Sequence, residues 1–263
     1  MSNKITRPTT IPQTLEDLMV EHAVAREALR LGFGHHKRLA RELRGKQVRR
    51  TVSEMFDQKV ETGTYINMFK VDIICGTGGL LSHAPRRAQS AMVLIDGFRP
   101  KGITKLAQDS VFMMPHLGVL STVHPKIALE IFEKDCLVRL GTCIALSWEN
   151  QINEGEKVVT ITGCMPDGNQ FEKDFYSGEI EVIPIEAGKE VELEISPSKH
   201  CNVGAGLGGA VKKRVEGGEV GIIVDTRGRP LMIPQNEGER RKRLLKWYRA
   251  MNLYPEEFLE GQL

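Results

Sequence analysis

The sequence predicts an α/β fold that is followed by a β-rich module and a closing helix. Strand-like and helical stretches alternate between residues 71 and 146. At 157–196 apolar and polar residues alternate, β-branched residues are frequent, and Gly, Asp and Asn supply turns. Residues 237–253 have a helical, basic pattern. We therefore expect an α/β region with a long N-terminal helix at 1–147, a β-rich module at 148–235 and a basic helical end at 236–263.

Composition narrows the class of protein. The 263 residues include 36 Lys and Arg against 34 Asp and Glu, and 41% are hydrophobic, as in ordinary globular proteins. The net charge of +2 gives no general attraction to nucleic acid or to an anionic membrane. No apolar run approaches the roughly 20 residues of a membrane span, and the N-terminus has no signal-peptide core. We expect a cytoplasmic protein without a nucleic-acid or membrane partner.

The first expected element is a long helix that begins after Thr14, whose hydroxyl can cap it. Apolar residues then recur at helical spacing as far as residue 33. Gly32 and Gly34 weaken the middle of this stretch, so a kink or break is expected there. Gly45 is the expected stop, and a shorter segment is expected at 48–57.

The next elements alternate in type. A strand at 71–75 ends at a glycine turn, and a helix is expected from near Pro85. After these we expect a strand at 103–106, helices at 110–120 and 125–135, and a strand at 137–146. Within the β-rich region, "PDGN" at 166–169 predicts a hairpin turn. Alternating strands and helices are typical of an α/β layer.

The glycine turn "GTGG" at 76–79 is the first candidate site. Glycines at the carboxyl end of a strand let a ligand approach the backbone, and the helix that follows favours an anion or a polar ring edge. The same glycines could simply turn the chain tightly, and the spacing alone leaves both readings open. The stretch is no Walker loop, because no Gly-Lys-Ser/Thr follows, and it lacks the third spaced glycine of a dinucleotide fingerprint.

Two further stretches have a functional and a structural interpretation. "NVGAGLGG" at 202–209 has fingerprint-like glycines, but no crossover helix follows, so a chain of turns is favoured. In "DTRGRP", Arg227 and Arg229 could bind a phosphate or a carboxylate. A strand end at which Asp225 pairs with an arginine is the favoured interpretation.

The remaining reactive residues indicate no catalytic or metal site. The five cysteines form no CxxC pair, which argues against disulfides, zinc and iron–sulfur clusters. Cys75, Cys136 and Cys143 are expected to be buried free thiols. His35 and His36 are adjacent and cannot share a helix face, so polar surface is expected there. The basic residues of 237–253 are expected to cover the solvent side of a helix that docks through Leu244, Trp247 and Met251.

Four stretches together resemble a known family. They are "RPTTIPQTLEDLMVEHAVAREALRL", "DIICGTGGLLSHAPRRAQSAMVLIDGFRPKGITKLAQDSVFMMPHLGVLSTVHP", "LGTCIA" and "EVGIIVDTRGRPLMIP". They are similar to the methylaspartate (glutamate) mutase accessory proteins, also called MutL-type, which are unrelated to the mismatch-repair protein of that name. The resemblance covers about residues 7–255. It implies the second lobe of an actin/Hsp70-like (ribonuclease H-like) ATPase fold, which packs a Gly-Gly turn against adenosine.

The resemblance implies residue roles as well as a fold. Gly76, Thr77, Gly78 and Gly79 inherit an adenosine-facing role, with Ser82 as a further nucleotide-binding residue and His83 as a neighbour with a weaker claim. No catalytic residue and no metal ligand is implied within this chain. The family's role is ATP-linked maintenance of adenosylcobalamin-dependent mutases and aminomutases. The expected ligands are ATP or ADP with Mg²⁺, and no cobalamin is expected to be bound by this chain itself.

The chain also departs from the family pattern. It resembles the carboxyl-terminal half of a longer protein, and the phosphate loop of the first lobe has no counterpart here. A sister chain that carries this lobe is therefore expected, and ATPase activity is expected only together with it. The alternative is a nucleotide-free scaffold that docks on the mutase or on the sister chain. Half of a small-molecule kinase is less favoured, because no acidic residue can be assigned as a base.

Overall fold

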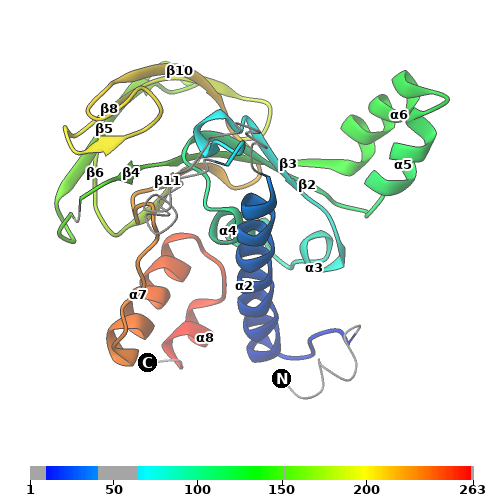
Figure 1. The fold of residues 1–263 in the computed structure, drawn as a ribbon, viewed down its shortest axis with the longest axis horizontal. Helices are drawn as coiled ribbons and strands as arrows, with labels where there is room; N and C mark the ends of the chain where they lie inside the picture. The colour runs from blue at the N-terminus through cyan, green and yellow to red at the C-terminus, as the bar shows by residue number, and fades with distance from the viewer. Residues whose placement is uncertain (1–9, 41–63, 151, 262–263) are drawn as a thin grey trace, which may run out of the picture.

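The computed structural model describes residues 10–40, 64–150 and 152–261. It shows a mixed α/β fold with several sheets and a C-terminal helix (Figure 1), which confirms the predicted class at that level. The expected segment at 48–57 and the expected stop at Gly45 lie outside the described residues. No helix in the described part of the chain is long and apolar enough to cross a membrane.

A five-stranded mixed sheet organises the molecule. Its strands, in spatial order, are β1 (Ile73–Gly76), β2 (Gly102–Asp109), β3 (Leu137–Ala145), β11 (Gly221–Asp225) and β7 (Ile180–Ile183). The pairs β1–β2 and β3–β11 are parallel, whereas β2–β3 and β11–β7 are antiparallel. Strands β7 and β11 come from the region expected as a β-rich module. That region therefore completes the sheet begun by residues 1–147, and the proposed division into domains stays a prediction.

Helices cover one face of this sheet (Figure 1). They are α4 (Arg87–Phe98), α2 (Leu15–Leu39), α7 (Glu237–Ala250) and α8 (Glu256–Glu260). Helix α4 contacts β1, β2 and β3, and α2 packs on α4. Side chains of the sheet, such as Leu140 and Ile223, share a core with Leu94 of α4 and Trp247 of α7. This core fixes the helical layer on the sheet.

The other face of the sheet carries a second, antiparallel sheet (Figure 1). Its order is β10 (Val211–Glu216), β8 (Glu190–Pro197), β5 (Lys157–Cys164) and β6 (Gln170–Tyr176). Ile144, Ile222 and Val224 face this sheet, while Ile223 faces the helices, because successive side chains of a strand alternate between faces. The "PDGN" hairpin is confirmed between β5 and β6, with Gly168 at φ 87°.

Residues 202–209 form the predicted chain of turns. The Asn202 side-chain oxygen accepts hydrogen bonds from the backbone N–H of Gly204 and Gly206, at 2.7 and 3.1 Å. The adjoining short pair consists of β4 (Ser147–Trp148) and β9 (Cys201–Asn202), and strand β10 follows the turns rather than a helix. The fingerprint interpretation of this stretch is wrong for that reason.

Helix α2 begins as predicted. Thr14 caps it, and its side-chain oxygen accepts a hydrogen bond from the Asp17 N–H at 3.1 Å. The expected break at Gly32 and Gly34 is wrong, because one helix runs through both residues. Helix α2 packs closely on α4, where a Cβ on Gly97 would lie 2.7 Å from the Leu29 Cβ. This tertiary packing outweighs the weak helix propensity of the two glycines.

The C-terminal helix also matches its pattern. The Asn236 side chain caps α7, and Trp247 and Met251 are buried with Leu244 packed against the same core. Its basic side pairs with carboxylates of the protein: Lys246 bonds Glu179. The apolar side chains Leu244, Trp247 and Met251 therefore pack this helix against the core on the five-stranded sheet, as the sequence predicted.

A helical hairpin extends from one end of the sheet, away from the rest of the molecule (Figure 1). It consists of α5 (Met114–Ser121) and α6 (Pro125–Ile131), and a π-helical turn at Phe132–Cys136 leads into β3. The expected helix at 110–120 begins at Met114 instead. Phe112 adopts φ 59°, and the Asp109 carboxylate accepts the N–H groups of Val111 and Met114, so residues 110–113 form a turn.

Candidate functional site

The glycine turn lies at the carboxyl ends of two neighbouring parallel strands. Strand β1 ends at Gly76 and β2 ends at Asp109, and Gly76 pairs in register with Gln108. Gly78, with φ 111°, precedes the four-residue helix α3 (Gly79–Ser82). In α/β sheets, ligands bind outside the carboxyl ends of parallel strands. The turn therefore lies where a ligand could reach the backbone.

The three glycines of the turn serve different purposes. A Cβ on Gly76 would lie 2.5 Å from Cδ1 of Leu81 and 2.9 Å from Cδ2 of Leu94, so the interior excludes a side chain there. Gly78 needs its positive φ, a conformation that costs other residues energy. At Gly79 neither reason applies, since no atom of the described residues lies within 4 Å of an added Cβ. The open, exposed backbone at Gly79 is thus the feature that packing leaves unexplained.

Hydrogen bonds fasten the turn to the end of β2. The Thr77 hydroxyl donates to the Asp109 carboxylate at 3.2 Å. The Ser82 hydroxyl lies 2.7 Å from the backbone carbonyl oxygen of Asp109 and 3.1 Å from that of Gly78. Ser82 is buried, so its hydroxyl faces the protein, whereas Thr77, Gly79 and the neighbouring His83 are exposed.

Asp109 is a residue of the candidate site that the sequence analysis did not identify. Its side chain is fully buried and accepts hydrogen bonds from the backbone N–H groups of Val111 at 3.2 Å and Met114 at 2.7 Å. Burial raises the pKa of this carboxyl, but the hydrogen bonds from the backbone and from Thr77 outweigh it and hold the pKa below its usual value. A charged Asp109 thus joins the glycine turn to the base of the helical hairpin.

The cysteines differ in their exposure. Cys136 and Cys143 are buried, which confirms that part of the prediction. The prediction of a buried Cys75 is wrong, because Cys75 is half-buried on β1, an edge strand of the sheet. Burial raises the pKa of the Cys143 thiol to about 12. Within residues 10–40, 64–150 and 152–261, no three His, Cys, Asp or Glu side chains are grouped so that they could hold a metal ion.

A second cluster of charged side chains lies at the end of β11. The buried carboxylate of Asp225 accepts hydrogen bonds from Arg227 Nε at 2.9 Å and Nη2 at 2.7 Å, and from Arg229 Nη2 at 2.7 Å. Burial alone would raise the pKa of Asp225, but the two guanidinium groups hold it far below its usual value. Both arginines point inward, so the structural interpretation of "DTRGRP" is confirmed.

The Asp225 cluster (Asp225, Arg227 and Arg229) connects several helices to the sheet. Arg227 Nη2 also lies 2.9 Å from a carboxylate oxygen of Asp96 on α4. The Arg227 guanidinium carbon is 4.9 Å from the ring centroid of Trp247 on α7, a cation–π contact. The cluster therefore holds α4 and α7 against the end of β11.

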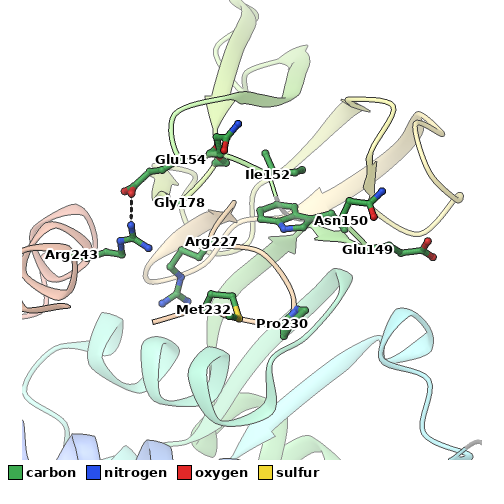
Figure 2. Close-up of a pocket in the computed structure, with 12 residues that line it drawn as sticks. Glu149, Asn150, Ile152, Glu154, Gly178, Arg227, Pro230, Met232 and Arg243 are labelled. Atoms are coloured by element: carbon green, nitrogen blue, oxygen red, sulfur yellow. Dashed lines mark hydrogen bonds and ion pairs between the residues drawn. The ribbon is translucent and has the colours of Figure 1, made fainter. Parts of the chain in front are cut away.

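A cavity of about 450 Å³ lies beside this cluster (Figure 2). Arg243 and Glu154 form an ion pair at one side of it, as Figure 2 shows. Arg227 also lines the cavity. Each of the two arginines in the lining, Arg227 and Arg243, is therefore already paired with a carboxylate, Asp225 and Glu154 respectively. The lining residues come from β4 and the segment after it, from the turn between β6 and β7, from the loop after β11 and from α7: Trp148, Glu149, Asn150, Ile152, Asn153, Glu154, Ser177, Gly178, Arg227, Pro230, Met232 and Arg243. None of them belongs to the glycine turn.

Comparison with protein families gives one result. A family model described as "MutL protein" matches residues 1–136, which include the glycine turn, Asp109 and the hairpin. Comparisons with curated proteins and with solved structures found no match. The matched region covers half of the chain.

Proposed function

Because the chain belongs to the MutL family of glutamate mutase accessory proteins, we propose that it supplies the adenosine-binding lobe of an ATP-linked reactivating factor. The family implies a role with a cobalamin-dependent glutamate mutase. In this proposal, ATP or ADP binds between the glycine turn and a sister chain that supplies the phosphate and Mg²⁺ contacts. Nucleotide binding then favours one conformation of the factor, which opens the mutase so that damaged adenosylcobalamin can leave.

The open backbone at Gly79 is the observation that carries the proposal. Packing explains the glycine at 76 and backbone conformation explains the one at 78, but none of the residues that the structure describes fills the space next to Gly79. A flat adenosine ring could approach this backbone, and Thr77, whose hydroxyl bonds Asp109, is an exposed residue beside it. The bonds from Thr77 and Ser82 to Asp109 hold the turn in a fixed position, so a ligand would meet a pre-organised surface.

The proposal places the actin-like lobe at the five-stranded sheet. The parallel pair β1–β2 presents the turn, and the second, four-stranded sheet lies on the opposite face from the helices. The residues of this chain would hold the adenosine end of the nucleotide only. Phosphoryl transfer depends on positioned phosphate contacts and Mg²⁺, and the proposal assigns these to the sister chain.

A nucleotide-free scaffold is the second candidate. It is favoured by the helical hairpin, whose apolar side chains lie exposed next to the turn. It is favoured also by the Ser82 hydroxyl, which is turned into the protein rather than toward a ligand. The two candidates differ in one measurable respect, which is whether adenosine compounds bind at the turn.

We expect the Gly79→Val variant to bind adenosine and ADP at least about tenfold more weakly than the wild-type chain, because the β-branched side chain would fill the space above the turn. Isothermal titration calorimetry of the purified full-length chain with millimolar adenosine, ADP and ATP measures this. The three ligands should bind the wild-type chain with similar affinity, since the proposal assigns the phosphate contacts to the sister chain. The chain alone should show no appreciable ATPase activity.

Gly32→Val is the matched control for this experiment. Gly32 also lies in a helix, has nothing within 4 Å of an added Cβ, and is remote from the turn. Its substitution should leave affinity unchanged, and thermal melts should show that both variants fold. If the wild-type chain binds none of the three ligands, or if Gly79→Val binds them as the wild type does, the adenosine role is refuted and the scaffold becomes the better proposal.

A further inference from the structure

The helical hairpin, residues 111–131, is held by its base and otherwise extends from the molecule (Figure 1). Helices α5 and α6 pack on each other and on the turn at Phe132–Cys136. Leu117 is the buried residue of α5 and Ala128 that of α6. Two short helices cannot bury their apolar side chains against one another alone, because each needs a further layer.

Apolar side chains surround α5 rather than forming one stripe. Val119 follows Leu117 by two residues, which is about 200° around a helix, so it faces away from the contact with α6. It is 72% exposed. The exposed large apolar side chains of the hairpin are Val111, Phe112, Met113, Val119, Val123, Ile127 and Leu129. A helix that is apolar all round is normally buried, which indicates that another surface covers this one.

The hairpin carries almost no charge. Lys126 and Glu130 are the only Asp, Glu, Lys or Arg residues between positions 111 and 131. They have opposite signs and lie one turn apart on α6, so the hairpin has no net formal charge with its histidines neutral. Two such hairpins can approach without like-charge repulsion, and a two-fold arrangement can place Lys126 of one copy near Glu130 of the other. The charges of the hairpin therefore allow it to pair with the hairpin of a second copy.

The exposed area allows an interface of modest size. The seven exposed apolar residues together present on the order of 600 Å² of surface, but they lie on more than one side of the hairpin, because Ile127 and Leu129 are two residues apart on α6 and so about 200° around it. One face of the hairpin therefore presents less than the roughly 800 Å² per partner of a standard protein interface, as in weak and reversible dimers. The hairpin is also rigidly presented, because the Asp109 carboxylate holds the N–H groups of Val111 and Met114 at its base.

We propose that the helical hairpin pairs with the same hairpin of a second copy of this chain. Two antiparallel helix pairs packed face to face form a four-helix bundle, which gives each hairpin the missing layer. Val119 would then lie in the bundle core, and Val123, in the turn between α5 and α6, would lie at one end of it. The inference is independent of nucleotide binding.

Sedimentation velocity of the full-length chain at about 1–100 μM tests the proposal. We expect reversible dimerisation with a micromolar dissociation constant. The double variant Val119→Glu/Val123→Glu should dimerise at least about 100-fold more weakly, because it would bury like charges in the interface. Both side chains are exposed, at 72% and 70%, so its melting temperature should be unchanged. Ile127→Lys is a second variant at the same surface, which tests the interface if the double variant fails to fold.

Leu31→Glu serves as the control, because Leu31 is an apolar side chain of α2 that is 56% exposed and lies outside the hairpin. It should dimerise like the wild type. Hydrogen exchange should slow at 114–131 as the protein concentration rises. A wild-type chain that remains monomeric at 100 μM overturns the proposal. So does a dimer that persists in the hairpin variants, because the copies would then meet elsewhere.

Discussion

The Asp225→Asn variant is expected to lose about 3–5 kcal/mol of unfolding free energy, the usual range when one partner of a buried ion pair is removed. Asp225 is completely buried and lies between two guanidinium groups that are themselves buried. An amide of the same shape cannot neutralise Arg227 and Arg229, and its NH₂ group would face donors. Asp96 still reaches Arg227, so Arg229 is the charge left without a carboxylate within the cluster.

Urea denaturation at pH 7, followed by circular dichroism, measures the loss. Asp174→Asn is the matched control, because Asp174 is also paired with a cation, Lys157, but lies at the surface of β6. Surface ion pairs contribute little, so this control should unfold close to the wild type. Equal midpoints for Asp225→Asn and the wild type would show that the cluster does not hold α4 and α7 on β11.

Local sequence patterns were sufficient to predict the elements that depend on interactions between residues close together in the chain. The Thr14 cap, the apolar stripe of α7 and the "PDGN" hairpin were all predicted and are confirmed. The start of α5 was not, because it depends on a side chain outside the expected helix. The Asp109 carboxylate takes the N–H groups of Val111 and Met114, which displaces the first helical turn.

The partner of each strand could not be predicted in the same way. Strand β11 pairs with β3, some 80 residues earlier in the chain, and periodicity says nothing about such pairings. One signal was present, however. Strand β8 alternates buried and exposed residues, whereas every residue of β11 is buried. A continuous apolar run is typical of a strand covered on both faces, so "GIIV" indicated the central sheet.

The place of the glycine turn between a strand and a helix was predicted, but its detail was not. The spacing identified the glycine turn, yet it could not separate the three glycines by the space around them. Nor could it show Asp109, because the expected strand ended at residue 106 and β2 continues to 109. The exposed apolar residues of the hairpin were interpreted as ordinary short helices, since a sequence does not show what covers a helix.

The stability of the protein is expected to fall by roughly 3 kcal/mol between pH 6.5 and pH 4 because of His22 alone. Burial between α2 and the C-terminal segment, together with the smaller effect of the nearby positive charge of Arg26, lowers the pKa of His22 from 6.5 to about 4. The ring Nδ1 lies 3.1 Å from the Tyr254 hydroxyl, and its Nε2 is buried with no hydrogen-bond partner among the described residues. A protonated ring would thus add an unpaired charge beside Arg26, whose own carboxylate partner is Asp96.

The sign follows from proton binding. Below pH 6.5 the unfolded chain protonates this histidine, while the folded chain does so only near pH 4, so unfolding takes up a proton and becomes easier as the pH falls. Urea denaturation at pH 7.5, 6, 5 and 4 measures the slope. In His22→Gln the decrease over this range should be smaller by roughly 3 kcal/mol, because the amide does not titrate. His35→Gln, an exposed position on the same helix, should keep the wild-type slope. An unchanged slope in His22→Gln would contradict the assignment, because the pH dependence would then arise from other groups.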